Sequence, residues 1–487
     1  MVKATAFRLI PPLETYPRVV TFAQTLAGKM LLLALFAAGL SLRTDQWLPI
    51  SACLLALTLL PRFRPLLLTI ATVGSLSLAG WPNVAPPWSI RQLHHPTIPG
   101  YQPLIMAAIL GSFALYYGAV KNNRAGWIGK RPVRNLLAFY LLLLLAATQV
   151  PLANPQVVYL WAFVAGFGKY LWYFNYTLLD RQARDTPRLA LQAGHYLPFW
   201  GGAATPFPKG AAYLRKIEAK EPRQLAISQL KGLKLLYWAI ALGVLEKVLR
   251  QICYGTPAAA QAILGIPFAL SLPSFPAILH GGPGAPAYPW HTNWLALVAN
   301  FFCRLLWFTV WGHLIIACCR MAGYNALRNT YRPLQSASIA EFWNRFYYYF
   351  KELLVDNFFY PAFLRYFKKW PQLRLFFAIL AAAGFGNVLY HFLHDVEGIV
   401  DRGFWPALYG HRVYMFYGLV LSVAITISQL YEKRRPQGMS WFRKHIINPV
   451  YVVGFYCLLS IFDSSDPTLS LGDHFRFLLK LFLIHLT

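Results

Sequence analysis

The stretch Phe-Thr-Val-Trp-Gly-His-Leu-Ile-Ile-Ala, from Phe308 to Ala317, decides the fold class because it is apolar along its whole length except at Thr309 and His313. It lies within an apolar run from Trp294 to Cys318, which is long enough to cross the hydrocarbon core of a bilayer as a helix. Several similar runs occur elsewhere in the chain. The sequence therefore predicts a helical membrane protein, in which a buried histidine needs an explanation.

The composition supports this fold class. Hydrophobic residues make up 57% of the chain and charged residues 13%, with a mean hydropathy of +0.43, whereas a soluble domain is about one-quarter charged. The formal net charge of +28 does not indicate a nucleic-acid partner, because Lys and Arg occur in short loops between apolar runs rather than on one soluble face.

The cysteines and paired histidines predict no metal site. The six cysteines form no C-x-x-C pair and lie mostly in or beside apolar runs, so they indicate neither a disulfide framework nor a zinc site. The pair His94-His95 lacks acidic or Cys neighbours and gives only a weak metal signal.

A helix needs about 20 apolar residues to span the hydrocarbon. The runs from Trp47 to Leu78 are broken by Pro61-Arg62-Phe63-Arg64-Pro65, which predicts a helical hairpin or a bent pair.

The segment Met1 to Arg18 has no convincing small-residue cleavage site behind it and is interpreted as part of a retained anchor. We expect one all-α polytopic domain over residues 1–487, with about eleven spans. The candidate spans are Thr21 to Leu42, Trp47 to Leu60, Leu66 to Leu78, Leu104 to Val120, Asn135 to Val150, Val157 to Leu179, Leu233 to Ile252, Trp294 to Cys318, Leu373 to Leu393, Pro406 to Leu430, Ile447 to Phe462 and Phe475 to Leu486.

The loops differ in charge. Lys121 to Arg134, Asp180 to Lys234 and Arg320 to Arg374 are basic, whereas Gln251 to Cys303 holds no Lys, Arg, Asp or Glu. Because basic loops of membrane proteins stay in the cytoplasm, the first set is placed there and the bare loop on the opposite face. The chain is thus expected to be a multi-pass protein of the cytoplasmic, or inner, membrane, with His391 in the outer half of its helix.

Two segments depart from a plain helical bundle. Tyr196 to Tyr213 is too rich in Gly and Pro for a regular helix yet too apolar for a water-exposed loop, which predicts a re-entrant or interfacial segment. Phe342 to Tyr366 alternates aromatic and basic residues, a composition typical of a helix in the headgroup plane.

Asn387, His391 and His394 form the strongest candidate site. Their spacings of four and three place them on one helix face. A titratable group at membrane depth is costly and usually faces a cavity or a partner. His391 is therefore either a packing histidine near an interface or a general base, a role that suits imidazole.

Other polar residues have simpler explanations. His313 is best explained by an interhelical hydrogen bond. Tyr347, Tyr348 and Tyr349 fit an interfacial aromatic belt. Asp356 lies among basic residues and is either an ion-pair partner or a residue that shapes the site.

An ordered motif set links these residues to a known family. The chain reads Asn-x-x-Arg-Pro, then Ser-x-x-Glu-Phe-Trp-x-Arg, then an Asp and a Pro. This order resembles the membrane-bound O-acyltransferases, in particular the bacterial branch that acylates polysaccharides and cell-wall polymers. His391 falls where the family's near-invariant histidine falls, and the motif-rich core is about 196–395. The matching residues are Asn329, Arg332, Pro333, Ser338, Glu341, Phe342, Trp343, Arg345, Asp356 and Pro361.

Three departures from the family pattern are visible. Tyr347 replaces the histidine that follows Arg-Trp, Tyr390-His391-Phe392 replaces Trp-His-Gly, and Gly312-His313 replaces Ser-Asp. The first change leaves His391 alone as the base. It indicates a different acceptor, or a member that no longer catalyses.

The resemblance implies an O-acyltransferase of EC 2.3.1 type, with helices around a central tunnel. An acyl group such as acetyl would pass from a thioester, either acyl-CoA such as acetyl-CoA or an acyl carrier protein, to a hydroxyl of a polysaccharide, glycolipid or other extracytoplasmic acceptor. Membrane lipids and an extracytoplasmic protein are expected partners, and no cofactor is expected beyond the co-substrate. The alternatives are a transporter or flippase, and a catalytically silent partner of an export complex. The implied catalytic residues are His391 and Asn387; the supporting ones are Tyr347, Asp356, Tyr390, His394 and His313; and the donor-binding ones are Arg332, Trp343 and Arg345.

Overall fold

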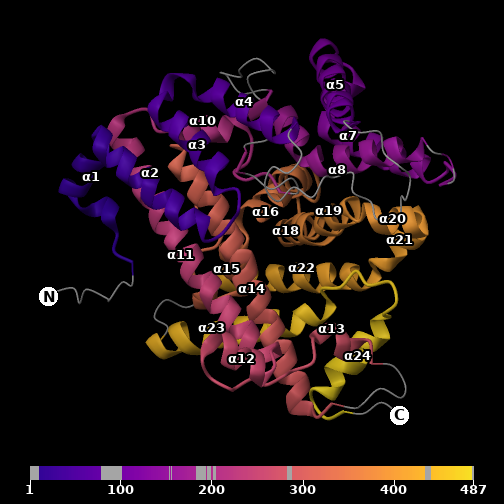
Figure 1. Cartoon of the computed structure of the whole chain (residues 1–487). Helices are drawn as coiled ribbons and strands as arrows, with labels where there is room; N and C mark the ends of the chain where they lie inside the picture. The colour runs from indigo at the N-terminus through magenta and orange to yellow at the C-terminus, as the bar shows by residue number, and fades with distance from the viewer. Residues whose placement is uncertain are drawn as a thin grey trace.

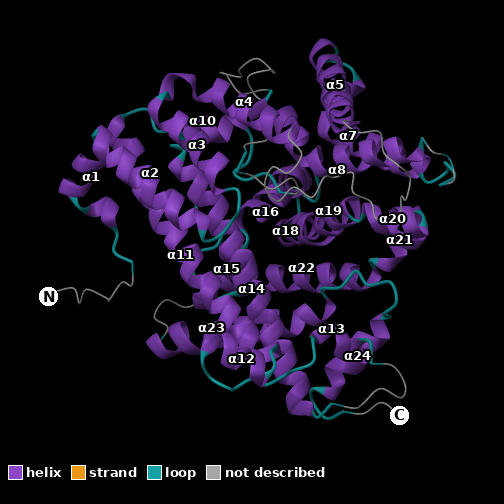
Figure 2. Cartoon of the chain, viewed as in Figure 1, coloured by secondary structure: helices purple, strands orange, loops and turns teal. Residues whose placement is uncertain are grey.

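The computed structural model of the chain describes residues 10–77, 101–152, 154, 156–181, 193–194, 199–200, 205–281, 288–433 and 440–484. Helices joined by turns and loops make up this part of the protein, and it contains no strand (Figures 1 and 2). The all-α prediction is confirmed for these residues. Residues 1–9, the pair His94-His95 and seven residues of the expected re-entrant segment, 196–198 and 201–204, lie outside them.

Within the described residues, six helices are long and apolar enough to cross a membrane, and the number of candidate spans rises to eight if each of two bent pairs counts as one. The multi-pass prediction is supported, whereas the expected count of about eleven is not confirmed. The six candidates are α5 (Tyr101–Asn122), α8 (Val157–Asp180), α14 (Trp290–Met321), the continuous segment of α18 (Pro371–Ile379), η5 (Leu380–Gly386) and α19 (Asn387–His394), then α22 (Arg412–Lys433), and the segment of η6 (Arg443–Ile447), α23 (Asn448–Leu459) and η7 (Ser460–Phe462).

Three expected spans do not pass this test. The last one, Phe475 to Leu486, overlaps only α24 (Leu471–Lys480), whose ten residues reach about 15 Å, half the hydrocarbon thickness. α7 (Pro132–Ala147) has 16 residues and is also short. α11 (Pro222–Tyr254) is long enough to cross a bilayer, but its charged residues make it too polar to count as a candidate span.

The first bent pair is α1 (Pro17–Gln24) and α2 (Leu26–Ser41), which meet at 97°. Thr25 starts the new helix because its hydroxyl accepts a hydrogen bond from the backbone N–H of Gly28 at 3.0 Å. A side chain at Gly28 would lie 2.0 Å from the carbonyl oxygen of Phe22, so the bend requires glycine there.

The second bent pair confirms the prediction made from Pro61 and Pro65. α3 (Trp47–Leu59) ends before the short helix η2 (Pro61–Phe63), and the chain continues in α4 (Arg64–Ser77) at 107° to α3. Proline cannot continue the hydrogen bonding of the preceding helix, which explains the bend at this position.

The expected single interfacial helix from Phe342 to Tyr366 is wrong. The segment is broken at Tyr347, whose φ of −136° and ψ of 68° are not helical. Phe342, Tyr349 and Leu353 are buried, so the first part of the segment packs inside the protein, and only its last part, from Tyr360 to Tyr366, is largely exposed. The pieces are α15 (Ile339–Phe346), α16 (Tyr348–Leu354), η4 (Val355–Phe359) and α17 (Tyr360–Arg365).

The long helices α11 and α14 lie side by side through the middle of the molecule (Figure 1). Gly232 permits this approach, because a side chain there would lie 3.0 Å from the carbonyl oxygen of Ala317. Nearby, the Ser228 hydroxyl donates to the Arg320 carbonyl at 2.8 Å. Three apolar clusters surround this pair: one around α5, α7 and α8, one around α1 to α4 and α11, and one around α22, α23 and α24.

Candidate active site

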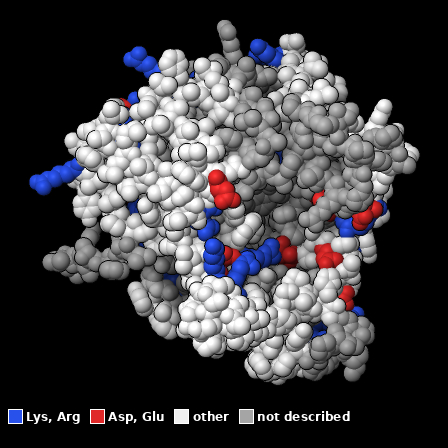
Figure 3. Space-filling model, in the orientation of Figure 1, with Lys and Arg blue, Asp and Glu red and all other residues white. Residues whose placement is uncertain are grey.

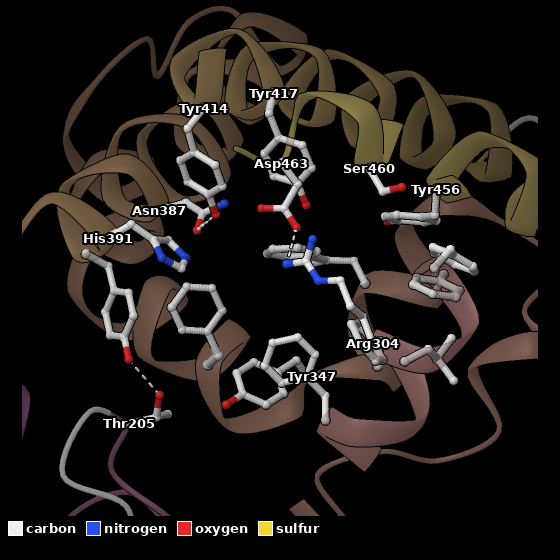
Figure 4. Close-up of a pocket in the computed structure, with 18 of the residues that line it drawn as sticks. Thr205, Arg304, Tyr347, Asn387, His391, Tyr414, Tyr417, Tyr456, Ser460 and Asp463 are labelled. Atoms are coloured by element: carbon white, nitrogen blue, oxygen red, sulfur yellow. Dashed lines mark hydrogen bonds and ion pairs between the residues drawn. The ribbon is translucent and has the colours of Figure 1, made fainter. Parts of the chain in front are cut away.

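A cavity of about 420 Å³ lies where these clusters meet, between α14, α15, α19 and α22. Its wall is mainly aromatic and carries a small number of polar groups, which is typical of a ligand site (Figure 4). The lining residues are Thr205, Phe301, Arg304, Leu305, Phe308, Phe342, Trp343, Phe346, Tyr347, Phe350, Asn387, Tyr390, His391, His394, Tyr414, Tyr417, Tyr456, Ser460 and Asp463.

The predicted helix face reaches this cavity. Asn387, His391 and His394 all lie on α19 and all line it, which confirms the placement inferred from their spacing. The His391 side chain is exposed to the cavity, and its imidazole makes no hydrogen bond to another described residue. The ring of Tyr414 approaches it with a centroid distance of 4.7 Å, and that of Tyr390 at 5.3 Å. Aromatic rings therefore hold the imidazole while its nitrogens remain available.

Hydrogen bonds fix the neighbours of His391. The Tyr414 hydroxyl donates to Asn387 Oδ1 at 3.0 Å, so the amide N–H groups of Asn387 are left for other partners. His394 Nδ1 lies 2.6 Å from the Tyr390 carbonyl oxygen and must carry the proton, because a carbonyl only accepts. His394 Nε2 is then an acceptor, and it has no partner among the described residues.

Tyr347 also lines the cavity, at the break between α15 and α16. Burial raises the pKa of its phenol to about 12, against a smaller opposing effect of the Thr205 hydroxyl. Tyr347 is therefore neutral near pH 7 and can donate or accept a hydrogen bond. Tyr390, in turn, shares a hydrogen bond of 2.8 Å with Thr205.

α15 separates two cavities. Trp343 faces the central one, as expected of a substrate-binding residue. Arg345 lies on another face of α15, where it pairs with Glu341 at 2.5 Å and lines a second cavity of about 820 Å³. Arg332 lies in the preceding exposed loop, with φ of 49°. The three expected donor-binding residues are thus not brought into one cavity.

Two expected supporting residues lie elsewhere. Asp356 is 2.9 Å from Lys209 Nζ and accepts a hydrogen bond from the Tyr176 hydroxyl at 3.0 Å, beside a separate cavity of about 340 Å³. Its ion-pair interpretation is the correct one. His313 is buried on α14 without lining the central cavity, and its Nδ1 has no partner among the described residues.

Several residues matched to the family motifs hold α15 and α16 in place. Asn329 is fully buried, and its side-chain oxygen accepts a hydrogen bond from the backbone N–H of Tyr349 at 3.2 Å. Ser338 starts α15 by accepting from the N–H of Glu341 at 3.1 Å, and Glu341 accepts from the N–H of Ala337 at 2.6 Å. These residues position the cavity wall rather than lining the central cavity.

The cavity also holds an ion pair that the sequence motifs did not predict. Arg304 Nη2 on α14 lies 2.7 Å from Oδ2 of Asp463, the residue that directly follows η7 (Figure 4). An arginine inside an apolar span was the available signal. The face in Figure 3 is largely uncharged, with acidic and basic side chains gathered near a central hollow.

No three His, Cys, Asp or Glu side chains gather into a potential metal site within the described ranges. The chain matches no protein-family model, and no curated protein matches it.

Proposed function

We propose that this protein is a membrane-embedded O-acyltransferase, similar to the membrane-bound O-acyltransferases, which moves an acyl group from a thioester to a hydroxyl. The observation that carries the proposal is His391, whose imidazole borders a cavity of about 420 Å³ and makes no hydrogen bond to another described residue. Membrane-depth histidines that serve only packing are expected to be enclosed and paired.

His391 is the general base in this reaction. The imidazole accepts the proton of the acceptor hydroxyl while the hydroxyl oxygen attacks the thioester carbonyl. The C–S bond then breaks, and the imidazolium returns the proton to the thiolate that leaves. Such general base catalysis contributes about 10²- to 10⁴-fold in rate.

Asn387 stabilises the oxyanion that forms on the carbonyl oxygen. Its side-chain oxygen is occupied by Tyr414, so its N–H groups are the part of the amide that a ligand can use. Loss of one such donor costs other acyl-transfer enzymes roughly 10²- to 10³-fold. The second cavity, beside Arg345, Lys444 and His445, is where the phosphates of acyl-CoA or an acyl carrier protein would bind.

Free thiol release tests the proposal. Purified full-length protein in lipid nanodiscs is incubated with acetyl-CoA and longer acyl-CoA donors, with and without alcohols, and thiol and acylated product are both measured. A transporter, a flippase or a silent partner protein releases no thiol. His391→Gln is expected to lower the rate at least about 100-fold.

The matched control is His474→Gln, a fully buried histidine on α24 outside the cavity. It should leave the rate near that of the unaltered protein if both variants unfold at similar temperatures. Full acyl transfer by well-folded His391→Gln protein would contradict the assignment.

A further inference from the structure

We propose that the Arg304–Asp463 ion pair positions the acceptor by holding a second hydroxyl group, so that the acceptor is an uncharged molecule with at least two hydroxyls. This inference rests on the proposed function, because it concerns the substrate of the same cavity. It adds a recognition site to the reacting groups on α19.

The pair is open to the cavity. The Arg304 side chain keeps 40% of its surface exposed and the Asp463 side chain 27%, although both lie among residues that line the cavity wall. In Figure 4 the pair faces the same open space as His391 and Asn387. Charged groups held in such a place are costly, and they are usually found where a substrate or ion passes.

The contact leaves hydrogen-bonding capacity unused. Arg304 and Asp463 make one contact, between Nη2 and Oδ2, and their other polar side-chain atoms have no partner in the described part of the chain. A hydroxyl group is both a donor and an acceptor. It can therefore donate to the free oxygen of Asp463 while accepting from an N–H of Arg304.

The charges of the pair select a neutral ligand. A carboxylate or phosphate that approached Arg304 would meet Asp463, and an amine that approached Asp463 would meet Arg304. Such like-charge approaches are disfavoured. Hydroxyl groups gain hydrogen bonds to both charged groups without this repulsion.

The pair and the base are within reach of one small molecule. Arg304, Asp463 and His391 line the same cavity of about 420 Å³, and their side chains face one open space in Figure 4. Asp463 follows a candidate span that begins at Arg443, so the positive-inside rule places the pair toward the non-cytoplasmic side. An acceptor that arrives from that side meets the pair and the imidazole in the same cavity.

The test uses two alcohols that differ by one hydroxyl, 1-octanol and octane-1,2-diol, with acetyl-CoA as donor and the full chain in nanodiscs. The unaltered protein should favour the diol in kcat/KM by about tenfold or more, the value expected for a hydrogen bond to a charged group. Asp463→Asn should reduce this preference to about twofold or less while turnover of 1-octanol persists.

Asp395→Asn is the matched control. Asp395 also pairs with an arginine, Arg402, at 3.2 Å with 27% of its side chain exposed, but it does not line the cavity. It should keep the preference for the diol. The inference is overturned if the unaltered protein shows no preference, if Asp463→Asn slows both alcohols by the same factor, or if Asp395→Asn abolishes the preference as well. These three outcomes concern the recognition of the acceptor. If no acceptor leads to thiol release, the proposed function itself is overturned instead.

Discussion

The Tyr414 hydroxyl donates to Asn387 Oδ1 at 3.0 Å, one helical turn before His391. This bond joins α22 to α19 and decides which end of the amide is occupied. Because the oxygen is taken, the N–H groups of Asn387 are the ones that can stabilise a negative oxygen next to the base.

Removal of that hydroxyl should therefore slow the reaction without removing the base. In Tyr414→Phe the amide of Asn387 is no longer held, and kcat should fall about tenfold with a smaller change in KM. Steady-state kinetics with acetyl-CoA and octane-1,2-diol measure both constants. Tyr140→Phe is the control, because it removes a buried tyrosine hydrogen bond to Val164 at 3.0 Å outside the cavity. An equal loss in both variants would mean that Tyr414 acts only through stability.

Tyr347 gives a prediction about which residue accepts the proton. Its pKa of about 12, set mainly by burial, means that it cannot serve as a base near neutral pH. Tyr347→Phe should keep kcat within about tenfold of the unaltered protein and leave the shape of the pH–rate profile between pH 6 and 9 unchanged. Loss of a titration limb in this variant would show that Tyr347, rather than His391 alone, carries the proton.

The sequence was sufficient to place the catalytic candidates on one surface. Asn387, His391 and His394 share a helix face by spacing alone, and the cavity lies on that face. The cap at the start of α15 was not predicted, although Ser338 and Glu341 have the three-residue spacing that is typical of one.

Ion pairs between distant segments of the chain could not be predicted from the sequence. Arg304 and Asp463 lie on segments far apart in the chain, and no local pattern specifies that they meet. Lys209 and Glu352, 2.6 Å apart, are a second such pair. The bend at Thr25 also lacked a proline signal, unlike the bend at Pro61, so a run that looked like one straight span is two helices.

Gly312 gives a prediction about packing. A methyl group at this position on α14 would lie 2.7 Å from Asn329 Nδ2, a fully buried side chain. Gly312→Ala should therefore destabilise the protein by about 1–3 kcal/mol, measured by thermal unfolding in detergent. Gly118→Ala on α5 is the matched control, because nothing lies within 4 Å of a side chain there. It should be neutral or slightly stabilising. Equal effects of the two variants would contradict the close packing of Gly312.

The partly buried charges around Lys209 give a prediction about the pH dependence of stability. Lys209 Nζ lies 2.6 Å from Glu352 and 2.9 Å from Asp356, and all three side chains are less than a quarter exposed. Burial lowers the pKa of Lys209, but the two carboxylates outweigh this effect and raise it. Burial likewise raises the pKa of Glu352, but the hydrogen bonds of Lys209 and Lys351 outweigh it, and the pKa falls below 4.5. Glu352 therefore contributes stability above pH 4.5 that is lost as the pH falls through its lower folded value.

Lys209→Met leaves the partly buried Asp356 without its ion-pair partner and Glu352 with Lys351 alone, and it should cost roughly 3 kcal/mol at pH 7. As the pH is lowered toward 4, Glu352 of the variant takes up a proton and the cost of burying its charge falls. The unfolding temperatures of variant and unaltered protein should thus differ most at pH 7 and converge near pH 4. Arg476→Met removes an exposed ion pair with Asp473. It should leave the unfolding temperature at pH 7 and at pH 4 close to that of the unaltered protein. A difference that stays constant from pH 7 to pH 4 would show that Lys209 acts through its apolar stem rather than through its charge.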